Sequence, residues 1–348
     1  MATLQAMLVR RLLAVLVAVG LVFAAVEVRA RLFPASSAPA VTDDDLRVVC
    51  ARELAPACDA LTTVTPAVVE DAATTVERFA ERDPGVDVWL TVAPWPELAA
   101  AGRARAGLPE IAATSSTVLA RSPAVVVARR DRLRALEPTC EGGRLTWRCV
   151  GDAAGRPWVE FDGDQRWGRV KVGLDHPDRS AEGLLSLSQA TSDFFAGEDW
   201  NSRSLGATGY FSWLSNLGAA VEQTVAQTPL ERMLLTGGAE YEITGALEAT
   251  AVPLLRSAPQ RAAQLVVRTV EPVVTADAVV VGYGGAGTVA VDAVAAQVTT
   301  ALADAGWRVA DTPPPSESQI PALPEDNGLP SAAALEALRQ LWIEVARG

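Results

Sequence analysis

Runs of valine and other apolar residues, separated by turn residues, divide most of the chain into predicted strands and helices. The runs at residues 46–50, 86–92 and 124–128 are typical of buried strands, because β-branched side chains suit a pleated surface that is covered on both faces. Between the first two runs, apolar residues recur at helical spacing from Pro66 to Ala80, so we expect a helix there. This alternation predicts a parallel sheet with crossover helices, and therefore an α/β fold.

The pattern changes between residues 131 and 168, where glycines, prolines and tryptophans interrupt any regular period. We interpret this segment as a turn-rich insertion or hairpin. A second strand–turn–helix unit follows it, and the alternation then resumes. The elements predicted for this half are a strand at 170–174, helices near 181–196, 210–226 and 229–236, a strand at 240–243, a helix at 245–255, strands at 265–270 and 278–281, a helix at 289–305 and an amphipathic helix after Ser331.

The turn at residues 175–180 carries the most suggestive chemistry. Asp178, Arg179 and Ser180 precede an apolar helix, and the free N–H groups of such a helix start attract anions and small ligands at a sheet edge. A plain N-cap by Asp178 or Ser180 explains the same residues, and a cap that faces a cleft does both. His176 is the single histidine, and we interpret it as a turn residue because no nucleophile elbow accompanies it.

The N-terminus has the pattern of a targeting segment. Arg10 and Arg11 precede an apolar run over residues 12–26, whose length of about 15 residues fits a secretory h-region and is short for a spanning helix. An uncleaved, tilted helix would act as an anchor. Residues 1–33 are therefore a predicted signal peptide or membrane anchor and residues 34–45 a linker, which places the fold outside the cytoplasm, secreted or anchored to the cell membrane. A buried helix of a soluble protein is the alternative.

The four cysteines fall in two close pairs, Cys50 with Cys58 and Cys140 with Cys149. Local pairing is the simplest of the three possible connectivities. The spacings are unusual for zinc and no histidine stands near either pair, so we expect no metal site. Disulfides persist in oxidising compartments, which agrees with export. Four free core thiols remain the alternative.

The net charge and the remaining motifs argue against nucleic-acid, nucleotide and metal binding. A net charge of −12 argues against a nucleic-acid partner, although solubility alone also explains it. The glycine-rich stretch at residues 282–287 lacks the acidic residue and the Lys-Ser/Thr pair of nucleotide loops, so we expect a flexible turn and no cofactor. Glu240, Glu242 and Glu248 have no matching Asp or His set, which favours solvated charge over a metal site.

Four segments together resemble a known family. In residues 171–187 a glycine in the strand, a proline in the turn and a serine before the helix fall in that family's order. The other segments are residues 48–56, 115–128 and 243–248. The chain resembles type 2 periplasmic-binding-protein-like extracellular solute-binding proteins, and particularly the actinobacterial solute-binding domains that are often fused to a von Willebrand A domain.

The resemblance implies a two-lobe clamp preceded by an N-terminal apolar helix. Its parts would be residues 46–130 as the first part of lobe 1, 131–168 as the insertion, 169–264 as lobe 2 and 265–348 as the return to lobe 1 with a C-terminal helix. It implies a small solute held between the lobes, closure about a hinge, no catalysis, and an ABC-type permease or membrane partner. The expected ligand-binding residues are Arg52, Ser115, Ser116, Ser180 and Thr244.

One departure keeps a second hypothesis open. Where the family usually offers a small hydroxyl residue to its ligand, this chain has Cys50, Ala51 and Arg52. The alternative function is that of a membrane-anchored interaction protein with a degenerate binding-protein fold that has lost its ligand. A cleft filled by the protein's own side chains would favour that alternative.

Overall fold

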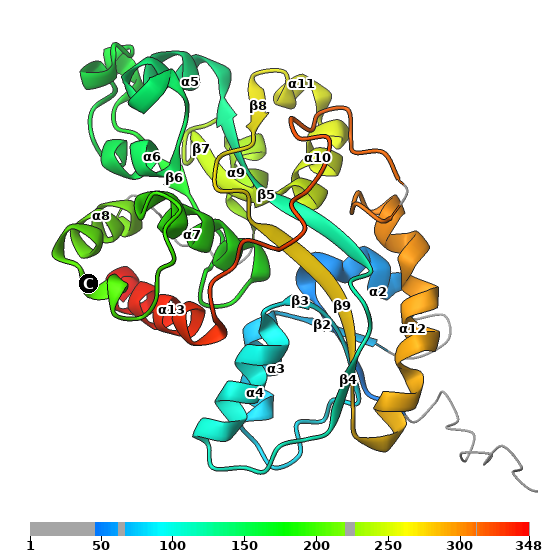
Figure 1. Cartoon of the computed structure of the whole chain (residues 1–348). Coiled ribbons are helices and arrows are strands. Elements are labelled where there is room, and N and C mark those ends of the chain that lie inside the picture. The colour runs from blue at the N-terminus through cyan, green and yellow to red at the C-terminus, as the bar shows by residue number, and fades with distance from the viewer. Residues whose placement is uncertain (1–45, 62–66, 220–226, 311, 348) are drawn as a thin grey trace, which may run out of the picture. The chain divides into compact units, whose positions relative to one another are not determined.

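The computed structural model describes residues 46–61, 67–219, 227–310 and 312–347 (Figure 1). The predicted targeting segment and linker lie outside the described residues. Residues 46–348 form one compact unit, in which a mixed sheet is divided between two lobes.

The first lobe contains one end of this sheet. Its strands are β1 (Val48–Ala51), β2 (Ala67–Glu70), β3 (Val88–Ala93), β4 (Ala113–Ser115) and β9 (Thr275–Tyr283). β1 and β3 are parallel, as the sequence predicted, and β2 is parallel to β1 on its other side. β9 runs antiparallel to β3 and pairs with β4 along its other edge. The order β2-β1-β3-β9 therefore places a strand from the far end of the chain inside the first lobe.

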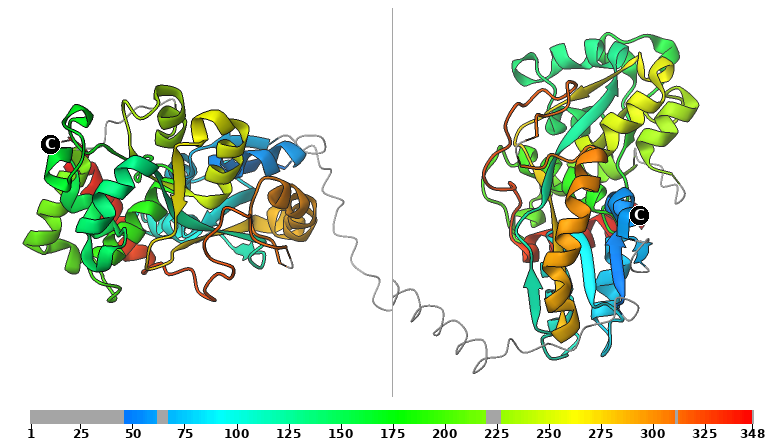
Figure 2. Two further views of the ribbon diagram at one scale, coloured as in Figure 1. Left: turned by 90° about the horizontal axis from the view of Figure 1, so that it is seen from above. Right: turned by 90° about the vertical axis from the view of Figure 1, so that its right-hand side faces the viewer.

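Helices cover both faces of this part of the sheet. α3 (Ala72–Phe79) and α4 (Trp95–Arg105) pack together against β1 and β3, while α2 (Ala55–Leu61) and α12 (Gly284–Asp304) pack against each other and against β1 and β9 (Figure 2). Among the described residues, α12 alone is long and apolar enough to cross a membrane. Its contacts with β9 and α2 make it a covering helix of the first lobe.

The second lobe is built around β5. The strands are β5 (Ala120–Arg129), β6 (Val172–Gly173), β7 (Ile243–Leu247) and β8 (Leu265–Arg268). β5 pairs antiparallel with β7 and with β8, and β6 is parallel to β7. The helices are α5 (Arg130–Leu136), α6 (Trp147–Ala153), α7 (Ala181–Phe194), α8 (Thr208–Ala219), α9 (Pro229–Thr236), α10 (Glu248–Ser257), α11 (Pro259–Ala262) and α13 (Ala332–Arg347).

Two long strands connect the lobes. The first residues of β5, from Ala120 to Pro123, pair with β9, and the residues from Ala124 onward pair with β7. Arg121 fixes this junction, because its guanidinium bonds Asp277 at 2.8 Å, the Thr275 hydroxyl at 2.7 Å and carbonyls of the returning proline-rich segment. The segment around Pro324 and Asp326 is thus fastened to the junction of the two lobes.

α13 adds a second connection between the lobes. It packs against α4 of the first lobe and against α7 and α8 of the second, and it buries Leu335, Leu338 and Trp342. Glu336 pairs with Arg105 of α4 at 3.1 Å, and Arg339 donates to the carbonyl oxygen of Asp178 at 3.0 Å. The amphipathic helix predicted after Ser331 is therefore present as α13, and it contacts both lobes.

Several sequence-based predictions of local structure are wrong. The expected helix after Pro66 begins with strand β2, because Val68 and Val69 pair with β1, and helix starts only after Asp71. The segment 131–168 is a set of short helices and turns around α6 and not a hairpin. The strand expected at 240–243 lies at 243–247, so the following helix starts at Glu248.

Two further corrections concern the end of the chain. The return to the first lobe was expected from residue 265, but β8 still pairs with β5 in the second lobe, and the chain returns with β9. The glycine-rich stretch is not a flexible turn, because it ends β9 and begins α12. Gly287 is required there, since a Cβ would lie 1.9 Å from the carbonyl oxygen of Asp87.

Both cysteine pairs are bridged as local pairs. The Cys50–Cys58 bridge ties the end of β1 to α2, and the Cys140–Cys149 bridge ties the turn after α5 to α6. Cys50 and Cys58 are fully buried. The first bridge therefore holds in place the loop that carries Arg52.

Candidate functional site

A cavity of about 340 Å³ lies between the two lobes. Its first-lobe wall is the loop after β1, and its second-lobe wall consists of the turn after β6 with parts of α7, α9 and α10. The charged residues of the lining are Arg52, Glu53, Asp175, Glu182 and Glu231. The two loops at the carboxyl ends of β1 and β6 thus meet here, as expected for a ligand site in an α/β protein.

The N-terminus of α7 is occupied by a side chain of the opposite lobe. One oxygen of the Glu53 carboxylate accepts hydrogen bonds from Ala181 N at 2.7 Å and Glu182 N at 3.2 Å. Ser180, the N-cap, accepts from Gly183 N at 2.9 Å. The position at which we expected a ligand anion is therefore filled by the protein itself.

Burial shapes the chemistry of Glu53. Loss of solvent raises the pKa of this carboxyl, and the hydrogen bonds from its own backbone and from Glu182 oppose the increase. The second carboxylate oxygen is buried and has no hydrogen-bond partner among the described residues. Glu53 therefore connects the lobes through one oxygen and leaves the other unsatisfied.

Glu182 belongs to the first turn of α7, and its backbone N–H is one of the two donors to Glu53. It accepts hydrogen bonds from Leu247 N at 3.1 Å and from the Thr250 hydroxyl. Burial, and then the nearby charge of Asp175, raise its pKa to about 8. Glu182 is thus mostly protonated at neutral pH and ionises in the mildly alkaline range.

Arg52 provides the single guanidinium of the lining. It pairs with Asp175 across the cleft at 3.1 Å and with Asp71 of its own lobe at 3.3 Å. Its side chain is 39% exposed, so it remains accessible from the cavity. Its positive charge is already matched by the two aspartates.

The structure does not bring the five predicted ligand residues together. Arg52 lines the cleft cavity, and Ser180 is buried beneath it as the N-cap of α7. Ser115 lines a different pocket in the first lobe, and the Ser116 hydroxyl donates to Thr117 O and accepts from Val280 N. Thr244 is fully buried in β7 and donates to Gly245 O. The reason is that Ser115 and Ser116 lie along β9 in the first lobe, where Ser115 belongs to β4.

Sequence reasoning missed the carboxylates that dominate the cleft. Glu53 and Asp175 each lie in the loop after a predicted strand, and Glu182 lies in the first turn of a predicted helix. Such positions were recognised for Arg52 and Ser180, so the same rule applied to acidic residues would have found all three. Their proximity, however, depends on how the lobes meet.

Comparison with known proteins identifies the fold. No family model and no curated protein matches the sequence. A ferric binding protein from Campylobacter jejuni is similar in structure, with a TM-score of 0.55 and 7% identity over 86% of this chain and 99% of that one. The sulfate-binding protein of Mycobacterium tuberculosis has a TM-score of 0.48 and 13% identity, covering 76% of this chain and 87% of that one.

The first of these likenesses shows the fold alone. Together with the two lobes, the mixed sheet and its connecting strands, it assigns the chain the two-lobe α/β fold of type 2 periplasmic-binding proteins. The fold class predicted from the sequence is thereby confirmed for the described residues.

Proposed function

We propose that this chain is an extracytoplasmic binding protein that holds a small cationic solute between its lobes, without catalysis. The observation that carries the proposal is the charge of the cleft cavity, which is lined by four carboxylates and one guanidinium. Arg52 has two acidic partners, Asp175 and Asp71, and Glu231 adds a further acidic side chain, so the cavity keeps a net negative charge even with Glu182 protonated. A cleft with one sign of charge concentrates ligands of the other sign.

An oxyanion fits this cleft poorly. Anion binding at the start of α7 would require displacement of Glu53 from two backbone N–H groups. The incoming anion would then lie near Asp175, whose negative charge repels it. A cation instead finds acidic side chains on both walls of the cavity, Glu53 on the first lobe and Asp175 and Glu231 on the second.

The fold and the disulfides support a location and a class of partner for this proposed function. The two bridges are expected in an oxidising compartment, which supports export. The fold supports delivery of the solute to an ABC-type permease, and the N-terminal segment supports attachment to the cell membrane.

A thermal-shift panel tests the cationic ligand class. We expect putrescine, spermidine, arginine or choline to raise the melting temperature by about 4–6 °C at a concentration of about 100 times Kd, because a ligand bound only by the folded state stabilises it. Sulfate, molybdate, glutamate and glucose should leave it unchanged. Asp175→Asn should remove the shift, whereas Glu77→Gln, an equal charge change on the exposed face of α3, should preserve it. Stabilisation by an oxyanion through this cavity would contradict the proposal.

A second candidate function is the ligand-free interaction protein. The observation that favours it is the bond from Glu53 to α7, which closes the cleft with the protein's own side chain. The lobes are further joined by Ala73 N, which donates to Arg179 O at 3.1 Å.

Glu53→Ala separates the two candidates. The variant leaves two helix N–H groups without their carboxylate, so we expect the free energy of unfolding to fall by about 1–3 kcal/mol in either case. In a solute-binding protein, the variant also binds the cationic solute more weakly, as calorimetry would show. If neither the wild type nor the variant binds any member of the panel, the ligand-free function is the correct one.

A further inference from the structure

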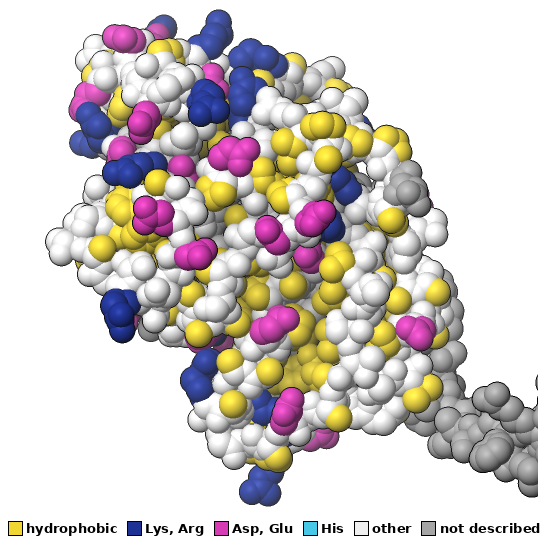
Figure 3. All heavy atoms as spheres, viewed as in Figure 1, with side chains coloured by type: hydrophobic (Ala, Val, Ile, Leu, Met, Phe, Trp, Pro, Cys, Tyr) yellow, Lys and Arg dark blue, Asp and Glu magenta, His cyan; other side chains and the backbone are white. Residues whose placement is uncertain are grey.

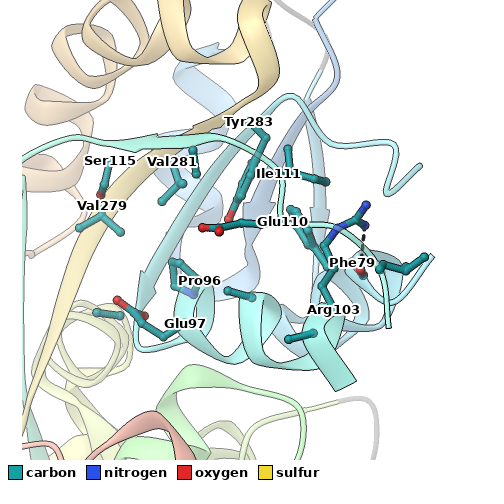
Figure 4. A pocket seen from close by; sticks show the side chains of 15 residues that line it. Phe79, Pro96, Glu97, Arg103, Glu110, Ile111, Ser115, Val279, Val281 and Tyr283 are labelled. Carbon is teal, nitrogen blue, oxygen red and sulfur yellow. Dashed lines mark hydrogen bonds between the residues drawn. The ribbon is translucent and has the colours of Figure 1, made fainter. Parts of the chain in front are cut away.

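A second cavity, of about 410 Å³, lies inside the first lobe between α4 and the strands β9 and β4. Figure 3 shows it as a hollow floored by hydrophobic side chains in the lower half of the molecule, and Figure 4 shows its lining from close by. It shares no lining residue with the cleft between the lobes. Its volume is in the usual range for a small-molecule site.

The walls of this lobe-1 pocket are mostly apolar and aromatic. β9 contributes Val279, Val281 and Tyr283, each at most 8% exposed. The Tyr283 ring lies against that of Phe79, with 4.5 Å between the ring centroids. Alanines of α4 form the opposite wall and leave the space between helix and sheet open.

Arg103 makes the rim of the pocket rigid. It is 6% exposed, and it donates to the carbonyl oxygens of Pro109 at 2.6 Å, Phe79 at 3.1 Å and Glu81 at 2.7 Å. These bonds tie the end of α3 to the loop after α4. The pocket is therefore preformed, and the guanidinium of Arg103 is engaged by backbone oxygens.

The remaining polar groups favour a cation. Glu97 and Glu110 line the pocket at exposed positions, and neither has an ion pair or hydrogen bond in the described part of the chain. The Tyr283 hydroxyl points into the pocket (Figure 4) and likewise has no hydrogen-bond partner among the described residues. Burial, and then the charge of Glu97, raise the pKa of Tyr283, so its hydroxyl stays neutral.

We propose that the lobe-1 pocket binds a small organic cation with an apolar body. The apolar body would lie against Val279, Val281 and the two aromatic rings of Phe79 and Tyr283. The cationic group would lie between Glu97 and Glu110, two carboxylates without another partner. This site is separate from the cleft between the lobes and does not depend on the function proposed for it.

Calorimetry with three matched probes tests the proposal on the purified protein. The probes are 4-phenylbutylammonium, 4-phenylbutanol and 4-phenylbutanoate, which share one apolar body and differ in charge. We expect the ammonium to bind most tightly and the carboxylate most weakly. Glu97→Gln and Glu110→Gln should each weaken ammonium binding by about two- to fivefold, the range of a partly exposed ion pair. Glu77→Gln on neighbouring α3 should leave it unchanged.

Two variants that fill the space locate the site. Ala104→Phe from α4 and Ala113→Phe from β4 both start from exposed positions, so each should fold, and each should abolish ammonium binding. Asp175→Asn in the cleft should preserve it. The proposal is overturned if no probe binds, if the alcohol binds as tightly as the ammonium, or if binding survives in both filled variants.

Discussion

Glu182→Gln is expected to reduce the loss of stability between pH 5 and pH 8. The pKa of Glu182 is raised to about 8 in the folded protein, so the folded state holds a proton that the unfolded chain releases near its ordinary value. A raised pKa contributes stability at low pH, and this contribution is lost as the pH rises through the folded value. The group accounts for a fall of about 3–4 kcal/mol over this range.

Glutamine keeps the neutral shape of the protonated acid. Its amide oxygen can accept from Leu247 N and the Thr250 hydroxyl, the two donors that Glu182 uses. We therefore expect the variant to match the wild type near pH 5 and to be more stable at pH 8. Urea unfolding at several pH values measures the difference, with Glu77→Gln as the matched control. Parallel pH profiles for the wild type and Glu182→Gln would show that the carboxyl titrates normally.

The same proton links stability to the proposed ligand. A cation in the cleft favours the ionised form of Glu182, so its binding should release protons near neutral pH. Affinity for the cation should therefore rise as the pH approaches 8. Ionised Glu182 destabilises the folded protein when the cleft is empty, and a bound cation would compensate its negative charge.

The sequence predicted those features that depend on local pattern. Valine-rich runs gave the buried strands β1, β3 and β5, and a serine before an apolar run gave the N-cap of α7. The pairing of Glu53 with α7 was not predictable, because the two are separated by 128 residues. The approach of the two lobes, which no local pattern describes, creates that contact.

For the glutamates near β7, the sequence-based prediction was wrong, again because it depended on contacts between distant parts of the chain. Glu240, Glu242 and Glu248 were expected to carry solvated charge. Glu242 and Glu248 are instead almost completely buried, and each pairs with an arginine, Arg132 or Arg308. The interpretation failed because their partners lie far away in the sequence and arrive only with the folded lobe.

Glu242→Leu is expected to be among the most destabilising single substitutions in the second lobe. Its carboxylate accepts from Arg132 Nε at 2.6 Å and from Trp158 Nε1 at 2.7 Å. The Arg132 guanidinium also lies 3.7 Å from the ring centroid of Trp167. Leucine would leave a buried guanidinium without its main partner, which typically costs about 3–5 kcal/mol. Asp131, 2.8 Å from Arg132, retains one bond and favours the lower end of that range.

The double variant distinguishes a lost ion pair from lost packing. Arg132→Met should destabilise the protein on its own, because Glu242 then keeps only the bond from Trp158. Combining it with Glu242→Leu removes both charges and replaces them with side chains of similar volume, so the double variant should recover much of the loss. Urea unfolding of both single variants and the double variant gives the coupling energy. Strictly additive losses would mean that Arg132 and Glu242 stabilise the lobe independently, and that the buried pair is not the unit that holds α5 against β7.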